Sequence, residues 1–197
     1  MGIEESKIPQ HWNYFLALEE DVSRLSRYLE LTQANFNAYS LELARILFAA
    51  ASEVDVVAKR LCERIEGAAD ADSINKYRGA IAPAYPEFAT STVSLPKFGL
   101  SLAPWEQWGK SRNPVWWTAY NKVKHHRHTD FERANLKNAL NAVAGLFVLL
   151  LFFYETEATA GGLAPDPTLF RAGRPFTVDR LVWGPQTLSY RRDGREC

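Results

Sequence analysis

The segment AVAGLFVLLLFFY, from Ala142 to Tyr154, contains almost no polar side chain and restricts how the rest of the chain can fold. A helix that is apolar on all sides must be enclosed, either by other parts of the protein or by lipid. The run is shorter than the roughly 20 residues that a membrane span needs. We therefore expect the core helix of a soluble protein, extending from Phe131 to about Thr156, with Asp130 as its N-cap.

Three other segments have the periodicity of amphipathic helices that would cover this core. Residues 11–31 place apolar side chains every three or four positions. A second segment begins between Asn35 and Ser40, where capping residues cluster, and its apolar stripe continues to about Gly67. We expect these two helices to pack antiparallel. A shorter helix, residues 73–81, is expected to stop ahead of Pro83 because proline removes a backbone donor.

The region between these helices and the core segment predicts a small β-hairpin. Valine and leucine alternate with hydroxyl residues on both sides of the turn-forming sequence Pro-Lys-Phe-Gly at residues 96–99. Asn113 and Pro114 then have the character of a helix start. The pattern as a whole predicts an all-α fold, a helical bundle of four to five helices with a small β-hairpin insertion and an irregular C-terminal tail.

Length and composition divide the chain into one domain and an extension. We expect residues 1–162 to form the helical bundle, because 197 residues suit a single core better than two. Residues 163–197 are rich in Pro, Gly and Arg, and FTVDRLVWG is their only strand-like run. This extension is either an ordered part of the same domain or a loose basic arm.

Composition also restricts the partners and the compartment. Lys and Arg together number 23, as do Asp and Glu, so any binding to nucleic acid or to a membrane needs a local patch. The acidic opening MGIEESKIPQ lacks the apolar centre of a signal peptide. Cys62 and Cys197 form neither a disulfide framework nor a CxxC pair, which is typical of a reducing cytosol. We expect a cytoplasmic protein with no cofactor and no membrane partner.

Basic side chains concentrate just ahead of the core helix, where residues 116–130 read WWTAYNKVKHHRHTD. At 100° per residue, a helix here has two different faces. One face carries Trp117, Asn121, Lys124, His125 and His128. The other carries Trp116, Tyr120, Val123 and Arg127. We expect the aromatic face to anchor the segment in the core and the polar face to point outward, where lysine and histidine side chains can bind phosphate.

This segment resembles the HEPN superfamily (higher eukaryote and prokaryote nucleotide-binding domains), compact all-α bundles with a polar motif ahead of the final long helix. In active members the motif reads arginine, a polar residue that is often asparagine, about three variable residues, and histidine. Here YNKVKH places Asn121 at the polar position and His125 at the histidine, with Tyr120 where arginine is expected. The resemblance covers roughly residues 10–157 as a helix pattern. For active members it implies metal-independent RNA cleavage, usually across a homodimer interface.

The tyrosine changes what the resemblance implies for catalysis. A transesterifying ribonuclease needs a base for the 2′-hydroxyl proton and a cation that holds the phosphate as charge develops. His125 has the chemistry of that base, but Tyr120 cannot supply the cation. Lys122, Lys124 and Arg127 are the available substitutes, although an ammonium group lacks the bidentate fork of arginine. The resemblance therefore supports the fold better than it supports catalysis.

Other residues near the motif have more than one interpretation. His128 shares the polar face and is a further phosphate-binding candidate, whereas His126 lies off that face and is expected to be an ordinary surface histidine. No Cys, Asp or Glu stands at zinc-ligand spacing from His125 and His128, so we expect no metal site. Glu53 lies at the edge of the second helix's apolar stripe. Its carboxylate either orients His125, pairs with Lys124, or is a solvated border residue.

Three functions from different classes follow. The first is a HEPN-like module that binds RNA or a nucleotide, is non-catalytic, and belongs to a toxin or phage-defence system. The second is a metal-independent endoribonuclease with His125 as general base, Asn121 and Glu53 beside it, and Lys122, Lys124, Arg127 and His128 as phosphate ligands. The third is a purely structural helical oligomer, which leaves the clustered lysines and histidines without a role. The missing arginine places the binding module slightly ahead, and for either of the first two we expect a homodimer.

Overall fold

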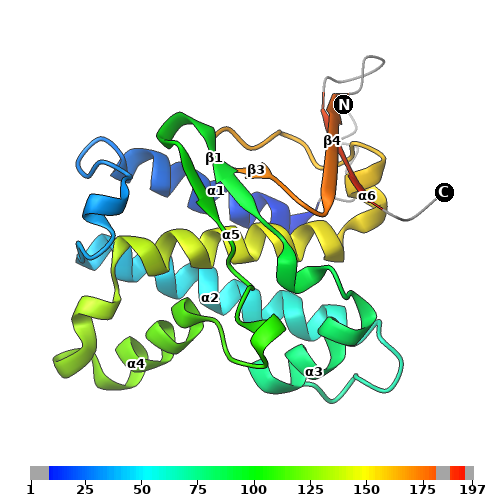
Figure 1. The fold of residues 1–197 in the computed structure, drawn as a ribbon, viewed down its shortest axis with the longest axis horizontal. Coiled ribbons are helices and arrows are strands. Elements are labelled where there is room, and N and C mark those ends of the chain that lie inside the picture. The colour runs from blue at the N-terminus through cyan, green and yellow to red at the C-terminus, as the bar shows by residue number, and fades with distance from the viewer. Residues whose placement is uncertain (1–8, 181–186, 194–197) are drawn as a thin grey trace, which may run out of the picture.

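The computed structural model describes residues 9–180 and 187–193, and this part of the chain is predominantly helical with small antiparallel sheets (Figure 1). The helices are α1 (Gln10–Leu25), α2 (Leu41–Cys62), α3 (Ile74–Ala84), α4 (Val115–Asp130), α5 (Leu136–Phe153) and α6 (Glu155–Thr159). Three of them, α1, α2 and α5, lie along the long axis of the molecule. The chain is therefore mainly α, as predicted, but it is not purely α.

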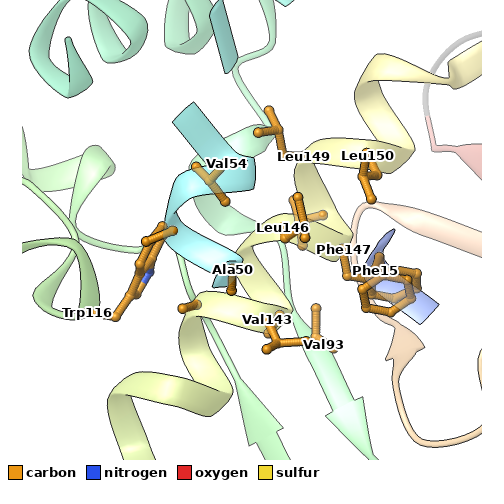
Figure 2. Packing of buried hydrophobic residues seen from close by; sticks show 14 of the residues in the cluster. Phe15, Ala50, Val54, Val93, Trp116, Val143, Leu146, Phe147, Leu149 and Leu150 are labelled. Carbon is orange, nitrogen blue, oxygen red and sulfur yellow. The ribbon is translucent and has the colours of Figure 1, made fainter. Parts of the chain in front are cut away.

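Helix α5 is the centre of the core. It is long and apolar enough to cross a membrane by length and composition, yet 89% of its most apolar window is buried inside the protein. Helix α2 packs along it, with Ala50 and Val54 facing Val143 and Leu146 (Figure 2). On the α1 side, the ring of Phe15 stacks on Phe147 with centroids 4.9 Å apart. Protein side chains thus cover the apolar surface of α5, as in the core helix of a soluble protein.

The N-terminal cap of α2 agrees with the sequence expectation, whereas that of α5 does not. Ser40 caps α2 as predicted, since its hydroxyl accepts a hydrogen bond from the Leu43 N–H at 3.1 Å. The final helix begins five residues after the predicted Phe131, and its N-cap is Asn135, whose side-chain oxygen accepts from the Asn138 N–H at 3.1 Å. The predicted cap, Asp130, is wrong, because its carboxylate is bound to Arg133 in the 3-10 turn that follows α4.

Two small sheets contain the strands. In the first, β1 (Val93–Leu95) lies between β2 (Leu100–Leu102) and β3 (Arg171–Ala172), all antiparallel. The first two strands flank residues 96–99, where the alternating pattern predicts them. The second sheet pairs β4 (Phe176–Arg180) with β5 (Leu188–Arg192). Strand β4 begins the strand-like run of the extension, whose residues 181–184 lie outside the described residues.

The described part of the extension packs against the helices, and it is not the irregular tail that we expected. Glu19 of α1 is buried and accepts the backbone N–H groups of Thr168, Leu169 and Phe170 at 2.9, 2.7 and 3.0 Å. Arg192 of β5 is also buried and forms ion pairs with Glu87 and Glu155. A carboxylate inside the helical layer and a guanidinium inside the extension therefore connect the two parts.

Candidate functional site

Helix α4 is fixed to the core by its first turn. Trp116 is buried, and its indole N–H donates to the carbonyl oxygen of Pro104 at 2.9 Å. Gly145 of α5 permits this close approach, because a Cβ built there would lie 3.0 Å from Cζ2 of Trp116. Figure 2 shows Trp116 and Phe147 at opposite sides of the core cluster around α5. The aromatic face of α4 is thus anchored as predicted, and its opposite face remains on the surface.

A shallow pocket of about 320 Å³ lies on that outer face of α4. It is lined by Asn113, Trp117, Thr118, Asn121, Lys122, His125 and His126. Its polar groups are therefore amides, a hydroxyl, an ammonium and two imidazoles. Among the described residues, no group of three or more His, Cys, Asp and Glu side chains could hold a metal ion.

The pocket brings together three of the residues that the motif predicts, namely Asn121, Lys122 and His125. Two other predicted phosphate ligands lie elsewhere on the helix. The ammonium of Lys124 is 5.5 Å from the centroid of the Tyr120 ring, and the guanidinium of Arg127 is 5.1 Å from that of Phe131. Both cations are therefore placed over aromatic faces outside the pocket lining.

A break in α4 explains where the histidines lie. His126 has φ −135° and ψ 43°, which is not helical, so the last turn does not continue the axis of the first three. As a result His126 lines the pocket, although a straight wheel places it off the polar face. His128, expected on that face, is exposed and is not part of the lining. Nothing in the local residue pattern marks this kink.

Tyr120, at the position where the motif expects arginine, is used for packing. Its ring lies edge-on to Phe48 of α2, with centroids 5.6 Å apart, and 5.5 Å from the Trp117 ring. It does not line the pocket. A guanidinium does reach the pocket rim from α3, where Nη1 of Arg78 lies 3.5 Å from the side-chain oxygen of Asn113. Sequence reasoning missed Arg78 because only the tertiary fold brings α3 beside the start of α4.

Glu53 is not part of this group. Its Oε1 is 2.5 Å from Nδ1 of His11, at the start of α1, so the structure does not pair it with His125 or Lys124. The side of α2 that carries Glu53 packs against α1, whereas Phe48 marks the side toward α4. Of the interpretations given for Glu53, the two that place its carboxylate beside His125 or Lys124 are therefore wrong.

The lining of the pocket includes one ammonium group, that of Lys122, and no carboxylate. Lys122 has no carboxylate within ion-pair distance among the described residues. At the end of the helix, a hydrogen bond from Arg133 holds the pKa of the Asp130 carboxyl below its usual range, and the charge of Lys122 adds a smaller effect. Asp130 thus stays ionised but is already bound to Arg133, which leaves Lys122 available to an anionic ligand.

Comparison of the chain with models of protein families, with curated proteins and with solved structures finds no match. Any functional conclusion must therefore come from the geometry of the site and from the motif.

Proposed function

We propose that this chain is a HEPN-like module that binds RNA or a nucleotide through the pocket on α4 and does not cleave it. The proposal treats α1, α2, α4 and α5 as the helical bundle of that superfamily and the cytosol as its location. The observation that carries it is the joint presence of Asn121, Lys122 and His125 in one pocket. All three lie within the six-residue motif at residues 120–125.

The chemistry of the lining favours a phosphate group with a base beside it. Lys122 donates to phosphate as a point charge, and imidazoles at His125 and His126 add donors that gain charge on protonation. Amide groups such as those of Asn113 and Asn121 can hydrogen-bond a base edge or a ribose hydroxyl. The volume of about 320 Å³ is at the lower end of ligand pockets and suits one nucleotide unit.

The role of Tyr120 favours binding over cleavage. Its ring is committed to Phe48 and Trp117, so no cation occupies the motif position that would stabilise charge on the phosphate during reaction. A ribonuclease is the second candidate, and the guanidinium of Arg78 at the rim is the specific observation in its favour. Both candidates include the homodimer implied by the resemblance, which light scattering of the purified chain would measure.

Two lysines on α4 provide a matched test of the proposal. Lys122 lines the pocket, whereas Lys124 lies over Tyr120, and both are exposed. Lys122→Ala should weaken binding of a short single-stranded RNA and reduce its salt slope by about 0.7, the value for one phosphate contact in single strands. Lys124→Ala should leave the slope unchanged. Fluorescence anisotropy at several salt concentrations measures both, and equal effects of the two substitutions would reject the pocket as the binding site.

His125→Ala separates binding from chemistry. In a binding module the substitution changes affinity, most strongly in mildly acidic buffer, and no RNA is cleaved by either protein. In a ribonuclease it leaves affinity nearly unchanged and lowers cleavage in EDTA by about 10²- to 10⁴-fold, the usual contribution of a general base. Cleavage by the wild-type chain that His125→Ala abolishes would replace the first candidate with the second.

A further inference from the structure

The contact that removes Glu53 from the motif forms a second polar cluster at the start of α1. His11 lies between two residues of α2, with Nδ1 at 2.5 Å from Glu53 Oε1 and Nε2 at 3.3 Å from Nη1 of Arg60. The side chains of His11 and Glu53 are only 12% and 15% exposed, so water screens their interaction less than that of a surface pair. In Figure 1 the start of α1 and helix α4 lie toward opposite sides of the molecule.

The carboxylate determines the orientation and the tautomer of His11. A carboxylate is only an acceptor, so Nδ1 must carry the proton that it shares with Glu53. Nε2 is then the nitrogen that gains or loses a proton, and it points toward Arg60. The ring is also held edge-on to Phe153, with centroids 5.7 Å apart. His11 is therefore a positioned imidazole whose reactive nitrogen lies beside a guanidinium.

The charges around Nε2 favour an anion. Arg60 is exposed and has no carboxylate partner among the described residues. Arg64, four residues further along and just beyond the end of α2, has its guanidinium 3.8 Å from the centroid of Phe153 and donates to the Phe153 carbonyl oxygen at 2.6 Å. Tyr154 faces the cluster from the end of α5, where burial raises its pKa, so the phenol stays neutral at physiological pH. Among the described residues, Glu53 is the carboxylate in contact with His11, and it lies on the Nδ1 side.

We propose that His11 and Arg60 form a second ligand site, which takes a dianionic oxyanion of the phosphate class and binds it together with a proton. In the unliganded arrangement, Nη1 of Arg60 lies at hydrogen-bond distance from Nε2. When Nε2 is protonated, it and the guanidinium repel each other, and an oxyanion between them accepts a hydrogen bond from each. Glu53 stabilises the imidazolium from the other side. This site shares no residue with the α4 pocket. The result of the RNA-binding experiment therefore does not determine the result of the anion-binding experiment below, or the reverse.

Sulfate is the sharpest probe, because it remains a dianion across the working pH range and any pH dependence then belongs to the protein. Titration of the wild-type chain with sulfate, followed by the ring-nitrogen NMR signals of His11, should show tighter binding at lower pH, since the anion and the proton bind together. As the pH rises, affinity should fall with a limiting slope of about tenfold per pH unit, the slope expected when one proton is bound with the ligand. Binding that is independent of pH would overturn the proposal.

Arg60 and its neighbour Lys59 provide the matched pair. Both are exposed cations on α2, and only Arg60 contacts His11. Arg60→Ala should weaken sulfate binding by about tenfold, the loss of one charge-assisted hydrogen bond. Lys59→Ala should change it by less than about twofold, because an exposed charge without contact acts only through screened solvent. Equal losses would show general attraction by the charge of α2 and would reject the site.

Two further arms address the positioning carboxylate and the source of the ligand. Glu53→Gln should move the pH profile of sulfate binding to lower pH, because the imidazolium loses its anionic partner, and an unshifted profile would contradict the role given to Glu53. Inorganic phosphate and methyl phosphate are titrated in the same way. The probe that binds more tightly shows whether the ligand is the free ion or a phosphomonoester. Failure of both to shift the His11 signals would also overturn the proposal.

Discussion

At the scale of single residues, the close approach of Trp116 to Gly145 joins the core to the helix that carries the proposed pocket. We predict that Gly145→Ala lowers the free energy of unfolding by about 1 to 3 kcal/mol, the usual cost of overpacking a core. The added Cβ would be 3.0 Å from Cζ2 of Trp116, whose indole is also held by Pro104 and cannot retreat freely. Because Trp117 of the pocket is the next residue, ligand binding should weaken as well.

Gly79 of α3 provides the control for this substitution. A Cβ at Gly79 meets nothing within 4 Å, and the residue lies within a helix. Gly79→Ala should therefore stabilise the protein by about 0.5 to 1 kcal/mol through helix propensity alone. Chemical denaturation of the two variants measures both values. A stability for Gly145→Ala equal to that of wild type would mean that Trp116 does not fix α4.

At the scale of secondary-structure elements, the start of α5 separates the observed cap from the predicted one. Asn135→Ala should cost about 1 kcal/mol, because the Asn138 N–H then loses its side-chain acceptor. Asp130→Ala should cost less, since it removes an ion pair with the half-exposed Arg133 and a hydrogen bond from the exposed Thr129 hydroxyl, neither of which caps α5. Urea denaturation of both variants measures the two losses in unfolding free energy. A larger loss for Asp130→Ala would mean that Asp130, and not Asn135, caps the final helix.

At the scale of the whole molecule, Glu19 connects the helices to the extension. Glu19→Ala leaves the backbone N–H groups of Thr168, Leu169 and Phe170 without their acceptor, so we predict a loss of about 2 to 4 kcal/mol in unfolding free energy. The neighbouring Glu20 is exposed and, within the described part of the chain, pairs only with Arg24 on the same helix. Glu20→Ala should change stability by less than about 0.5 kcal/mol.

Limited proteolysis gives the second readout of the same connection. Cleavage after the arginines of the extension should become faster in Glu19→Ala than in wild type or Glu20→Ala, because the segment around Thr168 no longer docks on α1. Equal cleavage rates in all three proteins would mean that the ion pairs of the buried Arg192 hold the extension by themselves.

Several features of this protein follow from its sequence alone, because they depend on residues close together in the chain. The apolar run at Ala142–Tyr154 requires an enclosed helix, the spacing of apolar residues produces α1 and α2, and Ser40 caps α2 through a contact three residues away. Asn121 and His125 share the outer face of α4 for the same reason, since one helical turn separates them.

The tertiary structure decided the contacts between distant segments, which local periodicity does not encode. It bent α4 at His126, so the residues that line the pocket differ from those that share a face on a straight helical wheel. It brought Arg78 to the pocket rim and directed Glu53 to His11 rather than to the motif. It also buried Glu19 against an extension whose composition indicated an irregular tail, because three backbone N–H groups across some 150 residues of chain offered that carboxylate its hydrogen bonds.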